Sequence, residues 1–89
     1  MNVDFRKSFE KDLTDILDEN LLQKVKAVIE EVENAVSLAE IRNIKKLKTD
    51  GDYYRIRMGD YRIGLTISDD GVVVFVRVLH RKEIYRYFP

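Results

Sequence analysis

The sequence predicts an α+β domain in which an N-terminal strand and a pair of helices pack on an antiparallel sheet. Apolar residues recur at helical spacing through the first forty residues, and from residue 53 the apolar period changes to two. Turn sequences then separate three β-rich runs. A chain of 89 residues supports one domain, spanning 1–89, with a single compact core.

The first forty residues are expected to form a short strand and an αα-hairpin. A strand over 2–5 is followed by a helix whose apolar residues lie between 9 and 17. Residues 18–20 are a polar break before a second helix over 21–36, which carries an apolar stripe with glutamates largely off it. The connection after it is expected to contain a helical turn from Ser37 to Glu40, and then a basic run over 45–48.

Alternating residues from 53 onward predict a three-stranded antiparallel meander. The strands are expected over 53–58, 61–68 and 72–79, with turns at 59–60 and 69–71. If the N-terminal strand joins them, the sheet has about four strands. Residues 80–86 are expected to add a short C-terminal helix.

The alternation also assigns the two faces of the sheet. The apolar face, expected to receive both helices, would carry Tyr54, Ile56, Met58, Tyr61, Ile63, Leu65, Ile67, Val72, Val74, Val76 and Val78. The opposite face would carry Tyr53, Arg55, Arg57, Arg62, Gly64, Thr66, Val73, Phe75, Arg77 and Leu79. Arginine binds phosphate in a bidentate way and aromatic rings stack on bases, so this second face predicts a nucleic-acid groove. The alternative is a charged surface that keeps the sheet soluble.

Charge distribution and cysteine content restrict the classes of function that the chain can have. The net charge is zero, but residues 1–40 contain 5 Lys and Arg against 10 Asp and Glu, whereas residues 41–89 contain 11 against 6. The basic half either binds phosphate groups of a ligand or forms electrostatic interactions with the acidic half of the same molecule. The absence of cysteine excludes disulfides, thiolate nucleophiles and cysteine-ligated zinc. The N-terminus has no long apolar run, so we expect a cytoplasmic protein with no membrane partner.

Several motifs occur together in the order typical of one family. They are V-x-F at 3–5, F-x-K-D-L at 9–13, YRIR at 54–57, GDYRI at 59–63, the valine strand, and HRKEIY at 80–85. In this ordered set the chain resembles the RelE-type toxins of bacterial and archaeal toxin–antitoxin pairs. It departs from many relatives at Leu79, where they have glycine, and at Arg55 and Arg57, where some have lysine that can transfer protons.

The resemblance implies a toxin of a type II system that acts as a ribosome-dependent mRNA endoribonuclease, or mRNA interferase, and inhibits translation. Its implied partners are the ribosome, mRNA and an antitoxin encoded beside it, with which it would form a hetero-oligomer. The same fold includes ParE-like gyrase inhibitors without nuclease activity, which is the main alternative. A non-toxic nucleic-acid-binding module of this fold is a further alternative.

The resemblance also suggests site residues. Arg55, Arg57 and Arg62 match basic positions of the meander strands, and Arg81 and Tyr85 match the basic and aromatic positions near the C-terminus. Arg77 lies on the same basic face and is a candidate for an additional RNA contact. The lysines of the basic run are expected either to contact RNA or to be exposed to solvent only; they are Lys45, Lys46 and Lys48.

RNA cleavage by the 2′-hydroxyl needs a base, an acid and charge stabilisation, and arginines can supply the last without a metal. Because arginine keeps its proton near neutral pH, Arg55, Arg57 and Arg62 are expected to clamp phosphate. Arg81 is the next candidate to stabilise the phosphate or the leaving group. Tyr85 is the expected base, since nearby positive charge favours the phenolate. The single histidine, His80, is either a proton carrier or a structural residue buried with the valines. The aspartates at 60, 69 and 70 are expected to form turns, so neither a metal nor another cofactor is predicted.

Overall fold

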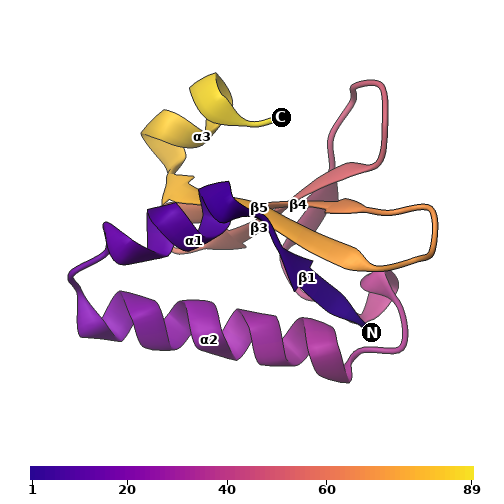
Figure 1. The fold of residues 1–89 in the computed structure, drawn as a ribbon, viewed down its shortest axis with the longest axis horizontal. Coiled ribbons are helices and arrows are strands. Elements are labelled where there is room, and N and C mark those ends of the chain that lie inside the picture. The colour runs from indigo at the N-terminus through magenta and orange to yellow at the C-terminus, as the bar shows by residue number, and fades with distance from the viewer.

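The computed structural model describes residues 1–89 and arranges three helices around one mixed sheet (Figure 1). The strand order is β1-β5-β4-β3-β2, with β1 parallel to β5 and the other pairs antiparallel. None of the helices is long and apolar enough to cross a membrane. The elements in chain order are β1 (Val3–Phe5), α1 (Lys7–Thr14), α2 (Glu19–Asn34), a 3-10 turn η1 (Leu38–Glu40), β2 (Ile44–Lys46), β3 (Tyr53–Met58), β4 (Tyr61–Ile67), β5 (Val73–His80) and α3 (Arg81–Tyr87).

The predicted α+β class is confirmed, with five strands where about four were expected. The additional strand is β2, which lies in the basic run and pairs with β3 through Ile44–Ile56, Lys45–Arg55 and Lys46–Tyr54. Three residues rich in lysine carry too little alternation to indicate a strand from the sequence. Helix α2 begins two residues earlier than expected, because the Asp18 carboxylate accepts hydrogen bonds from the backbone N–H groups of Asn20 and Leu21.

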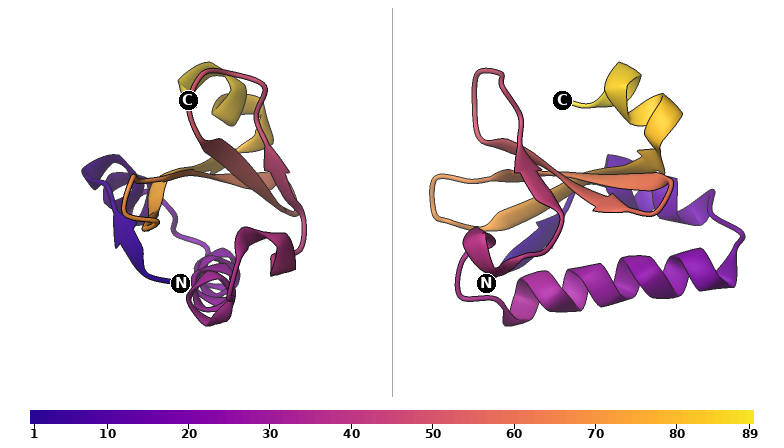
Figure 2. Two further views of the ribbon diagram at one scale, coloured as in Figure 1. Left: turned by 90° about the vertical axis from the view of Figure 1, so that its right-hand side faces the viewer. Right: turned by 180° about the vertical axis from the view of Figure 1, so that it is seen from behind.

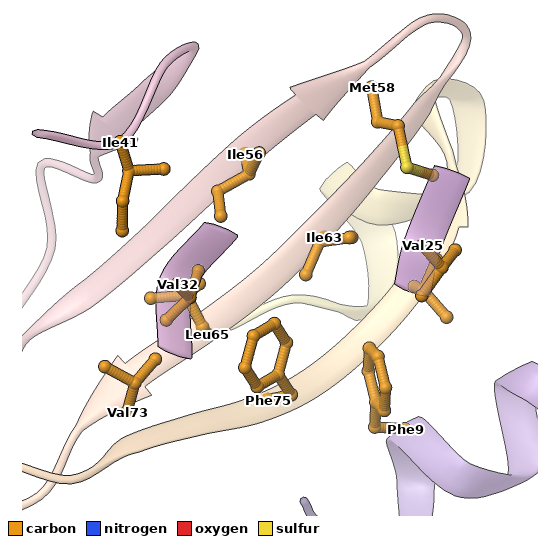
Figure 3. Packing of buried hydrophobic residues seen from close by; sticks show 11 residues of the cluster. Phe9, Val25, Val32, Ile41, Ile56, Met58, Ile63, Leu65, Val73 and Phe75 are labelled. Atoms are coloured by element: carbon orange, nitrogen blue, oxygen red, sulfur yellow. The ribbon is translucent and has the colours of Figure 1, made fainter. Parts of the chain in front are cut away.

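The helices occupy different sides of the sheet. Helix α2 lies along one face and α3 lies on the opposite side, toward which the β2–β3 loop also rises (Figures 1 and 2). The main core is between α2 and the sheet (Figure 3). It combines Val25 and Val32 of α2 with Phe9 of α1 and with sheet residues that include Ile56, Ile63, Leu65 and Phe75. Burial of such side chains stabilises the fold by roughly 1.5–3 kcal/mol each.

A bulge in β5 corrects the expected assignment of its faces. Gly64 pairs with Arg77 and Leu65 pairs with Phe75, so Val76 is an extra residue without a partner on β4. One extra residue exchanges the two faces, which buries Val73 and Phe75 in the core instead of Val72, Val74 and Val76. Beyond the bulge, Val78 is buried as predicted.

Helix α1 runs along the edge of β5 rather than across the face with α2, which corrects the expectation that both helices share one face. Strand β1 pairs only with the first half of β5. Beyond it, the Ser8 hydroxyl donates to the carbonyl of Val76 at 2.6 Å, and the Asp12 carboxylate accepts from the N–H of Val78 at 3.0 Å. Two side chains one helical turn apart therefore replace a neighbouring strand and cover this edge.

The C-terminal segment closes over the face of the sheet opposite α2. Phe88 is buried, and its ring lies against Gly64 of β4 and makes an edge-to-face contact with Tyr53, with ring centroids 5.7 Å apart. A methyl group built on Gly64 would lie 2.7–2.8 Å from three ring carbons of Phe88. Because a glycine in a strand interior packs nothing itself, Gly64 leaves the space that Phe88 and the end of α3 occupy.

Replacing Gly64 with alanine should therefore destabilise the fold. The added methyl group overpacks against the Phe88 ring, at an expected cost of roughly 1–3 kcal/mol. The measurement is chemical denaturation followed by circular dichroism, for Gly64→Ala in the wild-type and in a Phe88→Ala background. We expect the cost to disappear in the Phe88→Ala background, and an equal cost in both would contradict the contact.

Candidate nucleic-acid interface

A groove of about 370 Å³ lies on the α3 side of the sheet and is strongly basic. Its lining includes four cationic side chains, one aromatic ring and no carboxylate; the residues are Asn43, Ile44, Lys45, Arg55, Arg57, Arg62 and Tyr85. None of the four cations forms an ion pair with a carboxylate within 4.0 Å. Four like charges held together without a counterion favour the binding of an anion such as phosphate.

Strand alternation and register bring the predicted arginines together. Arg55 and Arg57 are two residues apart on β3 and so point to the same face. Arg62 of β4 lies directly opposite Arg57 across the β3–β4 pair. Like charges in direct opposition destabilise a sheet, so this placement costs stability unless an anion binds between them. The predicted clustering of Arg55, Arg57 and Arg62 is thus present in the structure.

Arg62 is held in place by its own hairpin turn. One guanidinium nitrogen donates to the carbonyl oxygens of Gly59 at 2.7 Å and Tyr61 at 2.9 Å. Gly59 has a φ of 61°, a left-handed conformation that glycine adopts without strain, and this forms the tight turn that presents both oxygens. The remaining guanidinium donors of Arg62 are free to bind a ligand. The arginine is therefore oriented before any ligand arrives.

Tyr85 of helix α3 contributes the one aromatic ring that lines the groove. Tyr85 is 68% exposed, and its ring is stacked on the Arg55 guanidinium with 4.5 Å between the guanidinium carbon and the ring centroid. A cation–π contact of this kind fixes the ring and leaves the hydroxyl accessible. The predicted base therefore lies beside the predicted phosphate clamp.

The basic run divides between the two faces. Lys45 is the register partner of Arg55 and lines the groove. Lys46 points to the other face, where it lies 3.6 Å from the Asp52 carboxylate and approaches the Tyr54 ring. Lys48 is exposed in the loop after β2 and does not line the groove. Of the three lysines expected to contact RNA, only Lys45 lies with the arginines.

Arg77, expected as an additional RNA contact, does not line the basic groove. Its guanidinium makes two hydrogen bonds to the Asp12 carboxylate, at 2.8 and 2.9 Å, and stacks near the Tyr87 ring. The hydrogen bond to Asp12 raises the pKa of Arg77, although burial opposes the effect. Arg77 is therefore a neutralised structural residue that joins α1, β5 and α3.

The two remaining candidates lie outside the groove. His80 shares the face of Val78, its ring contacts Tyr61 edge-to-face, and its Nδ1 accepts from the N–H of Lys82 at the start of α3. This places the imidazole away from the arginines and in a helix-capping position. Arg81 is exposed one helical turn before Tyr85, and its backbone N–H donates to the carbonyl of Asp60 at 2.7 Å.

Asp12 and Gly64 are positioning residues that the sequence reasoning missed. Asp12 lies among apolar residues on the buried side of α1, and Gly64 interrupts an apolar strand. A carboxylate on an apolar helix face indicates a buried partner, and a glycine inside a strand indicates close approach of another segment. Both signals were present in the sequence, but neither identifies its partner.

Comparison with known proteins identifies the family. The sequence pattern described as the ParE toxin of the type II toxin–antitoxin system parDE matches residues 3–85. The chain belongs to this toxin family. Over 90 residues the toxin is 47% identical to Toxin RelE3 of Methanocaldococcus jannaschii, with 100% of each chain covered.

Solved structures agree with this assignment. The toxin is similar to a chain of the RelB-RelE antitoxin–toxin complex from Methanococcus jannaschii, with 45% identity, a TM-score of 0.80, and coverage of 97% of this chain and 99% of that one. It also matches a chain of the archaeal RelE-RelB complex from Pyrococcus horikoshii, with 24% identity, a TM-score of 0.72, and coverage of 90% and 93%. At this identity, the similarity to the Pyrococcus horikoshii chain shows only that the two proteins share a fold. The predicted resemblance to RelE-type toxins is confirmed.

Loss of the Asp12 carboxylate should destabilise the toxin strongly. In Asp12→Asn the Arg77 guanidinium loses its counter-charge, and breaking a buried pair costs roughly 3–5 kcal/mol. We expect the lower end of this range, because the Arg77 side chain is 25% exposed and water replaces part of the interaction. The free energy of unfolding by urea denaturation is the measurement.

The matched control is Asp15→Asn on the same helix. Asp15 pairs with Lys11 at 3.8 Å on the exposed surface, where an ion pair contributes about 0–1 kcal/mol. Equal losses in the two variants would show that the Asp12–Arg77 pair has no special role in the fold.

Proposed function

We propose that this toxin is a ribosome-dependent mRNA endoribonuclease that inhibits translation. The observation that carries the proposal is the groove that three arginines and a lysine, none paired with a carboxylate, line together with the exposed ring of Tyr85. Such a groove suits one phosphate of single-stranded RNA, with a base stacked on the tyrosine. The similarity to RelE toxins also supports this proposed function.

The proposed reaction is attack of a ribose 2′-hydroxyl on the adjacent phosphorus. The new 2′-oxygen–phosphorus bond forms, the bond to the 5′-oxygen breaks, and the products are a 2′,3′-cyclic phosphate and a 5′-hydroxyl end. Tyr85, as phenolate, accepts the proton of the 2′-hydroxyl, whereas Arg55, Arg57 and Arg62 stabilise the charge on the phosphoryl oxygens. Arg81, exposed on α3 one helical turn before Tyr85, is the further candidate to stabilise the phosphate or the leaving 5′-oxygen.

An antitoxin is the proposed protein partner. The solved relatives from Methanococcus jannaschii and Pyrococcus horikoshii are complexes of RelE with RelB. An unpaired basic groove beside an exposed tyrosine suits an acidic segment that orders when it binds, which would bury both charge and apolar surface. The product of the adjacent gene is the expected source of that segment.

A gyrase-inhibiting toxin without nuclease chemistry is the second candidate. Its support is the matched family, whose description is that of a ParE toxin. In that case the groove would bind an acidic protein surface and Tyr85 would have no proton to transfer. RNA-end mapping and supercoiling of a plasmid in the same cells distinguish the two candidates.

Induced expression should arrest growth and produce new mRNA 5′ ends inside reading frames. Mapping those ends by sequencing is the measurement, and co-expression of the adjacent gene should abolish them. In Arg62→Ala the oriented phosphate contact is lost, so we expect cleavage to fall by roughly 10²–10³ while the fold persists.

The control for this variant is Arg42→Ala. Arg42 lies outside the groove and pairs with Glu31 at 3.8 Å, so its loss should leave the cleavage pattern unchanged. Growth arrest with relaxed plasmid and no new RNA ends would instead support gyrase as the target. A folded Arg62→Ala protein that cleaves normally would remove Arg62 from the site.

A further inference from the structure

Cleavage by the 2′-hydroxyl needs two proton transfers, one from the attacking oxygen and one to the departing 5′-oxygen. Arginine does not release a proton near neutral pH, so Arg55, Arg57 and Arg62 are unsuited to either step. His80 points to the other face of the sheet and caps α3 with its Nδ1. Among the lining residues, Tyr85 and Lys45 are the two with a transferable proton.

Lys45 enters the groove from β2, the strand at the far edge of the sheet. It is the register partner of Arg55, and partners on one face of an antiparallel pair have Cβ atoms roughly 4.5–5.5 Å apart. No carboxylate lies within 4.0 Å of its ammonium group, in contrast to Lys46, which pairs with Asp52. The ammonium group is therefore free to meet a ligand bound at Arg55.

Tyr85 reaches the same arginine from the opposite direction. Helix α3 packs on β4 and β5, and the Tyr85 ring covers the Arg55 guanidinium at 4.5 Å. A phosphate held by Arg55 then has Tyr85 on the β4–β5 side and Lys45 on the β2 side. Phosphoryl displacement requires the attacking and leaving oxygens to lie roughly in line across phosphorus. Tyr85 and Lys45 both adjoin Arg55 but come from different elements, so they are the two candidates to serve the two oxygens.

We propose that Lys45 is the general acid of this reaction, a role that rests on the nuclease function proposed above. As the bond between phosphorus and the 5′-oxygen breaks, the Lys45 ammonium donates a proton to that oxygen, which leaves as a 5′-hydroxyl. Lys45 becomes a neutral amine while Tyr85 gains the proton of the 2′-hydroxyl. Exchange with water afterwards returns one proton to Lys45 and removes one from Tyr85.

The test uses ribosomes programmed with two messages that differ at one atom of the mapped cleavage site. One message has the ordinary 5′-oxygen and the other has sulfur in its place, and a thiolate leaves without a proton far more readily than an alkoxide. Single-turnover cleavage of both is measured for the wild type and for Lys45→Arg, which keeps the charge but not the transferable proton. The control is Lys26→Arg, an exposed lysine on α2 at the other face of the sheet.

With Lys45→Arg we expect cleavage of the oxygen message to fall by roughly 10²–10⁴, the usual contribution of a positioned acid, and cleavage of the sulfur message to fall less than tenfold. Lys26→Arg should change neither rate. An equal loss on both messages, or no loss on either, overturns the assignment of Lys45 while leaving the nuclease function intact. A wild-type toxin that cleaves neither message refutes the nuclease function, and the role of Lys45 with it.

Discussion

The contact between Phe88 and Gly64 is the constraint on which the groove depends. Phe88 fills the space that a side chain on β4 would otherwise take, and this holds the end of α3 against the face of the sheet opposite the main core. Helix α3 is only seven residues long and would not be stable alone. Its docking brings Tyr85 over Arg55, so the tyrosine and the arginines form one site only while the C-terminal segment is folded back.

Much of this arrangement follows from local sequence patterns. The spacing of apolar residues predicts the αα-hairpin, and alternation after residue 53 predicts three strands and the shared face of Arg55, Arg57 and Arg62. These predictions succeed because side-chain direction in a regular strand depends only on the residue's position. The placement of Tyr85 beside the arginines came from resemblance to the RelE-type toxins, since no local pattern indicates how α3 folds back.

What the sequence could not predict depends on contacts between distant segments. The bulge at Val76 reverses the faces of the first half of β5. Alternation is uninformative there because every residue from Val72 to Val76 is apolar. Arg77 was expected to face RNA, but Asp12, 65 positions earlier, neutralises it. Strand β2 is held by its pairing with β3, and its sequence shows no alternation of apolar residues. Which of the lysines faces the groove could therefore be assigned only from the register, which places Lys45 opposite Arg55.

The central claim is that the groove cleaves RNA with the Tyr85 hydroxyl as base, and Tyr85→Phe tests it most directly. This variant keeps the ring and its stacking on Arg55 and removes one oxygen atom. Single-turnover cleavage on programmed ribosomes should fall by roughly 10²–10⁴ with little change in ribosome binding, because the cations of the groove remain. Near-normal cleavage by Tyr85→Phe, together with a large loss in Tyr85→Ala, would show that the ring only stacks and would contradict the account.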